Sequence, residues 1–146
     1  MKFEPKDSNF AEKVRESFAL QPVMSLIGAE LLRIEPGEVD IFLPYRADLT
    51  QQNGFLHAGI TAAIVDSACG YAAFSLMPVE TEVLTAEFKI NLLSPAIGDY
   101  FVAEARVLKP GKTLSAVRGD VYAFRGEEDK KLIAAMLATV VGVRKR

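Results

Sequence analysis

The chain of 146 residues contains one cysteine and one histidine, and each scarcity excludes a class of chemistry. One cysteine cannot form an intramolecular disulfide, which agrees with a reducing, cytoplasmic setting. With His57 as the single histidine, the sequence shows no repeated His, Cys, Asp or Glu spacing of the kind that binds zinc. Its glycines match neither a phosphate-binding loop nor a dinucleotide fingerprint. The sequence therefore shows neither a metal signature nor a nucleotide-binding fingerprint, and we expect no metal.

Charge and hydropathy exclude two kinds of partner. Lys and Arg number 17 and Asp and Glu number 19, a formal net charge of −2 with both signs interspersed. Neither nucleic acid nor a membrane surface is therefore expected as the main partner. The first residues lack the apolar run of a signal peptide, so none is expected. The apolar segment at residues 60–76 contains Asp66 and is followed by Pro78, which makes it too short for a comfortable membrane span.

The remaining patterns predict a single α+β domain over residues 1–146. Residues 10–20 predict a first helix within an N-terminal helical extension (residues 1–24), and Pro22 ends it. Alternating or continuous apolar runs predict six strands, at residues 29–34, 38–43, 84–92, 101–108, 113–124 and 132–143. Short turns among the last four strands favour antiparallel neighbours. We expect a curved antiparallel sheet wrapped around a buried central helix.

A glycine-containing loop at residues 51–57 runs directly into that central helix, whose residues are small or apolar on every side. A helix that is apolar all round is typically buried. It nevertheless contains one carboxylate, Asp66, and an isolated buried carboxylate is costly unless something compensates it. Two interpretations stay open: Asp66 is a structural carboxylate bonded to its surroundings, or it is a general base or nucleophile.

The start of the helix offers a complementary group. The backbone N–H groups of residues 57–59 lack intrahelical acceptors, and the helix dipole adds partial positive charge, so they can stabilise a carbonyl oxygen that becomes an oxyanion. Asp66 lies eight residues beyond Ala58, roughly 12 Å along the axis at about 1.5 Å per residue. One carbonyl cannot contact both within one chain. If the two groups cooperate, the protein is a homodimer with antiparallel helices and two equivalent interface sites.

For three further residues, a structural role is the simplest interpretation or one of two. His57, at the start of the helix, fits a local capping or packing residue. Cys69 has no second histidine to activate it and fits a small core residue. Lys112 lies in a turn, where it is either solvated or positioned to hold a phosphate.

The motif His57-Ala58-Gly59, with Asp66 nine residues after the histidine and Gln51 six before it, resembles the signature of hotdog-fold acyl-CoA thioesterases. The most similar group is the PaaI-type, 4-hydroxybenzoyl-CoA thioesterase-like branch. Two further segments share the likeness, residues 91–96 and 110–113. The resemblance implies a hotdog fold and hydrolysis of an acyl-CoA. CoA would be part of the substrate, so no separate cofactor is expected.

The same resemblance implies a role for each matching residue. The Ala58 N–H would polarise the thioester carbonyl, and Asp66 of the partner subunit would attack it or activate water. Gln51 would bond the thioester oxygen or position the water, and Thr85 would help to orient that water. His57 would fix the loop and transfer no proton.

The position of Ala58 departs from the family pattern, which usually has glycine there. An alanine keeps the N–H, but its methyl group narrows the site, and a positive φ at this position would add strain. We also expect the acyl chain to lie between the helix and the partner subunit, near Phe55, Leu56 and Phe74. The expected substrate-binding residues are Asn53, Gly54, Phe55, Leu56, Gly59 and Lys112.

Other functions stay open at this stage. A non-catalytic acyl-CoA binding or sensing domain would keep the cleft without turnover. A hydratase or dehydratase on the same fold would pair an acid or base with a histidine, and the only histidine stands at the thioesterase position. A purely structural interaction domain would leave Asp66 unexplained. A dimer of dimers is a further possible assembly.

Overall fold

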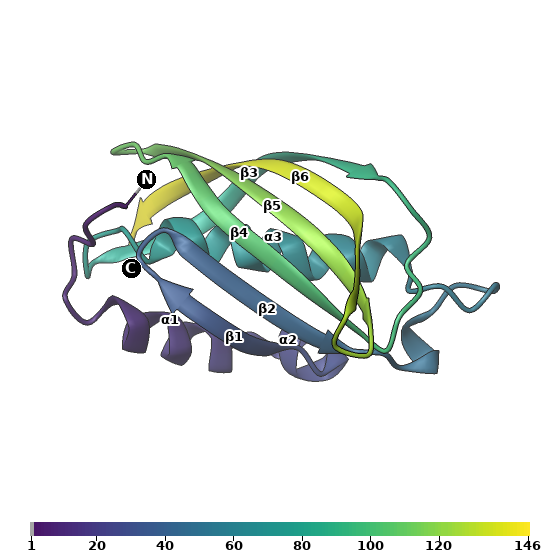
Figure 1. Ribbon diagram of the computed structural model, residues 1–146. Helices are drawn as coiled ribbons and strands as arrows, with labels where there is room; N and C mark the ends of the chain where they lie inside the picture. The colour runs from purple at the N-terminus through teal and green to yellow at the C-terminus, as the bar shows by residue number, and fades with distance from the viewer. Residues whose placement is uncertain (1) are drawn as a thin grey trace.

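Figure 1 shows the computed structural model, which describes residues 2–146 as a long helix partly enclosed by a curved sheet. The elements in chain order are α1 Phe10–Ala19, α2 Pro22–Ile27, β1 Glu30–Glu35, β2 Glu38–Pro44, the short 3₁₀ helix η1 Ala47–Leu49, α3 Ala58–Phe74, β3 Thr81–Leu92, β4 Tyr100–Lys109, β5 Leu114–Arg125 and β6 Asp129–Arg144. The predicted α+β class, the six strands and the central helix are all present.

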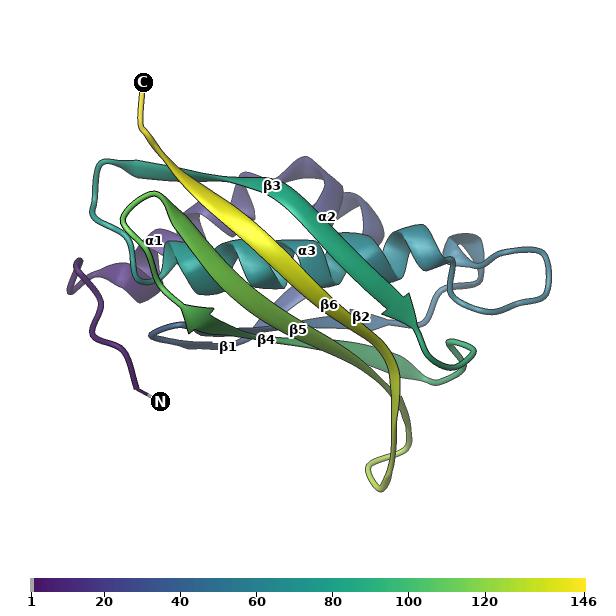
Figure 2. The same ribbon diagram turned by 90° about the horizontal axis from the view of Figure 1, so that it is seen from above.

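All strand pairs of the sheet are antiparallel, in the order β1-β2-β4-β5-β6-β3. The prediction that the last four strands are successive neighbours is correct for β4, β5 and β6 but wrong for β3. This strand pairs with β6, while β4 pairs with β2. The link between β3 and β4, residues 93–99, therefore crosses from one edge of the sheet to its interior. Figure 2 shows β3 and β6 side by side over α3.

The concave face of the sheet packs on α3. Alternate residues of β2 and β4 point inward, and Val39, Ile41, Leu43 and Phe101 are fully buried. Sheet and helix approach each other closely at Gly119 of β5. A Cβ added there would lie 2.4 Å from Val65 Cγ2, so the missing side chain is what allows the helix to lie this close.

The prediction that α3 is buried on every side is wrong for the single chain. Ile64, Val65, Ala68 and Cys69 face the sheet and are fully buried. The opposite side is open: Ala58 and Gly59 are exposed, and Ala62, Ala63, Asp66, Ser67 and Gly70 are half-buried. The sheet curves around only part of the helix, so the small residues of the far side have no cover from this chain.

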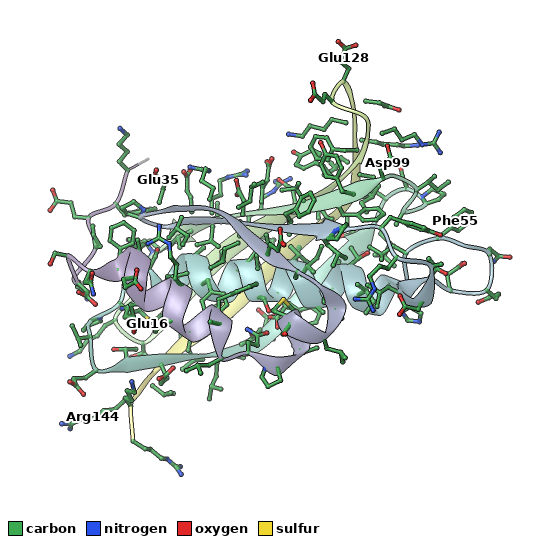
Figure 3. The ribbon with its side chains drawn as sticks, turned by 90° about the horizontal axis from the view of Figure 1, so that it is seen from below. Glu16, Glu35, Phe55, Asp99, Glu128 and Arg144 are labelled. Carbon is green, nitrogen blue, oxygen red and sulfur yellow. The ribbon has the colours of Figure 1, made fainter. Side chains whose placement is uncertain are left out.

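Two helices of the N-terminal extension lie along part of that open side (Figure 3). Helix α1 packs Phe18 against Tyr71 of α3, with ring centroids 5.9 Å apart. The sequence predicts no helix at residues 22–27, because Pro22 is expected to end the first helix. Pro22 stands instead in the first turn of α2, where proline is well tolerated. Within residues 2–146, no helix is long and apolar enough to cross a membrane.

Candidate functional site

The N-terminus of α3 presents one free backbone donor. His57 is the N-cap, and its Nδ1 accepts a hydrogen bond from Gly59 N at 2.8 Å. The N–H groups of Ile60 and Thr61 both donate to the His57 carbonyl. Within the part of the chain that the structure describes, the Ala58 N–H donates to no acceptor. The helix therefore directs a single unpaired N–H, at Ala58, outward from its positive end.

Alanine at position 58 causes no backbone strain. Among residues 2–146, no residue other than glycine has a positive φ. The strain expected if Ala58 required a left-handed backbone is therefore absent, and its methyl group is the remaining difference from a glycine. Ala58 is exposed and lines a cavity of about 380 Å³.

That cavity at the helix start has uncharged walls. Gln51, Phe55 and Leu56 line it on the loop side, and the end of β3 together with the following residues lines it on the other. The Gln51 carboxamide oxygen accepts hydrogen bonds from Asn53 N and Phe55 N at 2.5 and 3.3 Å, so it stabilises the loop. The Gln51 Nε2 group remains for a ligand. Asn53 and Gly54 form the exposed tip of the same loop.

Asp66 and Thr85 meet in a second cavity, of about 310 Å³. Thr85 Oγ1 donates to Asp66 Oδ1 at 2.7 Å, across the space between β3 and α3. If Asp66 is a structural carboxylate, its surroundings must compensate the free-energy cost of burying it. Asp66 is only half-buried and accepts one hydrogen bond from a hydroxyl group, so part of this cost is compensated. The second carboxylate oxygen is left to bond water or substrate.

Polar side chains that were not predicted surround this second cavity. Gln21 accepts a hydrogen bond from Ser67 Oγ at 3.0 Å through Oε1 and donates to Tyr71 Oη at 3.0 Å through Nε2. Ser17 Oγ lies 3.3 Å from the same Tyr71 hydroxyl. These contacts join residues 46 to 54 positions apart in sequence. No local spacing could have indicated them.

The predicted site residues thus fall into two groups on one helix. Gln51, Ala58 and the loop residues lie at its start, and Asp66 and Thr85 lie along its middle. Two expected substrate contacts lie apart from the first group. Phe74 lines a different cavity from Phe55, together with Lys13, whose Nζ is 4.5 Å from the Phe74 ring centroid. Figure 3 shows Phe55 at the opposite end of the molecule from Glu16 of α1, the helix that carries Lys13.

Lys112 also lies away from the helix start. It occupies the exposed turn between β4 and β5. Leu114, two residues later, pairs with Val141 of β6, and Val141 pairs in turn with Leu84 of β3. This turn therefore stands at the half of the molecule that holds Asp66. Within one chain it cannot act together with Asn53 and Gly54.

Cys69 does not act as a nucleophile. It is fully buried, and burial raises the pKa of its thiol to about 12, with the nearby carboxylates of Asp66 and Asp120 adding to the shift. The reactive thiolate is therefore negligible at neutral pH. Among the described residues, no three His, Cys, Asp or Glu side chains converge in a way that could hold a metal ion.

Acyl transfer needs a donor for the developing oxyanion and a base for water. The Ala58 N–H is a candidate for the first group and Asp66 for the second, but they are eight residues apart on one helix, roughly 12 Å along its axis. Within one chain the two candidate groups therefore cannot contact the same carbonyl.

Comparisons with known proteins identify the family of the chain. The chain matches the family model of the thioesterase superfamily over residues 53–130. A thioesterase family protein from Silicibacter pomeroyi is 52% identical, with a TM-score of 0.90 over 92% of this chain and 98% of that one. Acyl-coenzyme A thioesterase 13 of Homo sapiens is 32% identical over 94 residues, 62% of this chain and 65% of that protein. The PaaI protein of E. coli, from the phenylacetic acid degradation operon, has a TM-score of 0.84 and 16% identity over 96% of this chain and 97% of that one. The chain therefore belongs to the thioesterase superfamily and has the hotdog fold of its PaaI-type members.

Proposed function

We propose that this chain hydrolyses acyl-CoA thioesters to a free acid and CoA, at sites that two copies of the chain build together. The carbonyl oxygen bonds the Ala58 N–H of one subunit. Asp66 of the other subunit, oriented by Thr85, removes a proton from the attacking water. The observation that carries the proposal is that a free helix-start donor and an accessible carboxylate stand on one helix but too far apart to meet within one chain.

The uncovered surface next to these groups supports a second copy as the partner. Strand β3 ends the sheet, so its outer backbone edge is unpaired. Phe88 and Leu92 lie on the side of β3 that faces α3, and they are 43% and 57% exposed. They continue the open apolar side of α3. A two-fold pairing that runs the two helices antiparallel would cover this surface and bring Ala58 towards the partner's carboxylate.

The roles of the other predicted residues follow from this pairing and remain proposals. His57 holds the helix start through its bond to Gly59 and exchanges no proton. Gln51 Nε2 bonds the thioester oxygen or the water, and the loop residues Asn53 and Gly54 contact the CoA arm. Lys112, on the half that holds Asp66, would hold a phosphate of CoA from the partner's side. A dimer of dimers and a cytoplasmic location are also proposed.

Mixing two inactive variants tests both the reaction and the shared site. Asp66→Asn removes the base, and Ala58→Pro removes the N–H. Proline suits the first helical position, and the extended backbone of His57, with φ −60° and ψ 136°, is the conformation that proline requires before it. Each variant alone should lose at least about 100-fold in thiol release from acyl-CoA.

Random re-association of equal amounts of the two variants makes half of the dimers mixed, and each mixed dimer has one intact site of two. We therefore expect about a quarter of wild-type activity. Mixed dimers that form, as native mass spectrometry would show, but stay inactive would rule out the shared site. Wild-type protein that binds acyl-CoA without any turnover would make the sensing domain the better account.

A further inference from the structure

The cavity at Asp66 continues along the C-terminal half of α3 and ends at the N-terminal extension. Gly70, one turn after Asp66, lines it, and a Cβ added to Gly70 would meet no described atom within 4 Å. The cavity is therefore open beyond the carboxylate. Its far boundary consists of Ser17, Gln21 and Tyr71, which come from α1, the α1–α2 junction and α3.

These three side chains form a wall between this cavity and a neighbouring one. Gln21 bonds both Ser67 and Tyr71, and Ser17 contacts the same Tyr71 hydroxyl. On the other side of these residues lies another cavity, of about 420 Å³, which shares Ser17, Gln21 and Tyr71 in its lining. Removal of the Gln21 side chain would join the two cavities.

The wall keeps hydrogen-bonding capacity on its inner side. The Gln21 amide has two N–H groups, and Tyr71 accepts one of them. Ser67 Oγ donates to Gln21 and keeps its acceptor lone pairs. A ligand atom that reaches the wall can therefore accept from Gln21 or donate to Ser67.

The charges of the cavity decide which part of an acyl-CoA it suits. Two carboxylates, Asp66 and Glu82, line it, and no lysine or arginine is among its lining residues. The phosphates of CoA are repelled by such a site. The uncharged cavity at Phe55 and Leu56 is the better one for the pantetheine arm. This assignment differs from the expectation from the sequence, which placed the acyl chain near Phe55 and Leu56 as well as Phe74.

We propose, on the basis of the hydrolysis proposed above, that the acyl group lies in the Asp66 cavity and that Gln21, positioned by its hydrogen bond to Tyr71, determines its specificity. Gly70 stands four residues beyond Asp66, so the wall lies roughly 6 Å or a little more from the reacting carbonyl at about 1.5 Å per residue. The preferred substrate class is a short acyl group that carries a hydrogen-bonding atom at its far end. The N-terminal extension is then part of the substrate site.

The test uses three substrates and compares ratios of kcat/KM. Butyryl-CoA and 4-hydroxybutyryl-CoA differ by one terminal hydroxyl, and decanoyl-CoA is too long to fit between Asp66 and Gln21. Wild type should prefer the hydroxylated substrate by about three- to tenfold, the value of one hydrogen bond. Gln21→Leu and Tyr71→Phe should remove that preference. Gln21→Ala should also raise the decanoyl-to-butyryl ratio by at least about tenfold, because it opens the next cavity.

Two further variants separate specificity from folding. Gly70→Ala fills the cavity with one methyl group and raises helix propensity, so it should lower kcat/KM for 4-hydroxybutyryl-CoA without loss of stability. Ser25→Ala, at an exposed position of α2 outside the cavity, is the matched control and should leave every ratio unchanged. A merely loosened N-terminal extension would lower the rates for butyryl-CoA and 4-hydroxybutyryl-CoA together and leave their ratio intact.

The outcomes distinguish this inference from the proposed function. If Asp66→Asn is inactive but the hydroxyl preference survives both Gln21→Leu and Tyr71→Phe, the wall is not the specificity determinant and the hydrolysis stands. If Asp66→Asn keeps wild-type turnover, the assignment of Asp66 as the base and the assignment of its cavity to the acyl group are both wrong.

Discussion

The two cavities along α3 have opposite chemistry. The cavity at Ala58 has uncharged walls and a backbone donor at the positive end of the helix, whereas the cavity at Asp66 has two carboxylates and a ring of hydroxyl and amide groups. The first can stabilise negative charge and the second can accept a proton. Neither can do both. In the proposed hydrolysis, a single chain is therefore only half of a catalyst, and the reaction depends on how two copies meet.

The largest effect is expected from the carboxylate end. Asp66→Asn keeps the size and the hydrogen bond from Thr85 but cannot take up a proton, so kcat should fall by about 10²- to 10⁴-fold. Thiol release measures kcat, and circular dichroism checks that the fold is retained. Activity within tenfold of wild type would mean that the base lies elsewhere.

The donor end should be nearly as sensitive. Ala58→Pro deletes one N–H, and loss of such a donor typically lowers kcat by about 10²- to 10³-fold. Ala58→Gly is the matched control, because it keeps the N–H and the ordinary φ of this position imposes no need for glycine. Equal losses in the two variants would show that the methyl group, and not the N–H, matters at this end.

A smaller effect is expected from the residue that orients the carboxylate. Thr85→Val keeps the shape of the side chain and removes the hydroxyl that bonds Asp66. Hydrogen bonds to charged groups are among the stronger ones, so kcat should fall about tenfold with little change in KM. A larger rise in KM than fall in kcat would assign Thr85 to substrate binding.

The smallest effect is expected at Cys69, which faces the sheet between the two ends. Because burial raises the pKa of this acid to about 12, the thiol stays protonated from neutral pH up to that value. Iodoacetamide at pH 8 should modify it only in denatured protein, as mass spectrometry would show, and Cys69→Ala should retain activity. Rapid labelling of the folded protein would mean that the helix separates from the sheet.

Local patterns in the sequence were enough to predict the elements of this fold. The apolar helix and all six strands stand within a few residues of their predicted bounds, because alternation and composition are encoded by neighbouring residues. Helix α2 was missed because six residues are too few to show a helical period. The partner of β3 was also missed, since the pairing with β6 is decided by packing between residues 42 to 63 positions apart in sequence.

The candidate site also contains residues that local sequence patterns predict and residues that they do not. The motif at residues 57–59 and Asp66 stand on one element, so spacing along a helix revealed both groups and their separation. Gln21 and Tyr71 meet across 50 residues of sequence. Only the folded chain places the N-terminal extension against the cavity. The partial exposure of α3 could not be predicted either, because the composition of the helix does not show how far the sheet curves around it.

The capping bond at the start of α3 has a consequence for spectroscopy. Because His57 Nδ1 accepts from the Gly59 N–H, the ring proton of the neutral imidazole resides on Nε2, so one tautomer is selected. The chain has a single histidine, and its imidazole signals in an NMR spectrum therefore come from one place, next to the Ala58 donor. The protein has a natural reporter at the point where the substrate carbonyl would arrive.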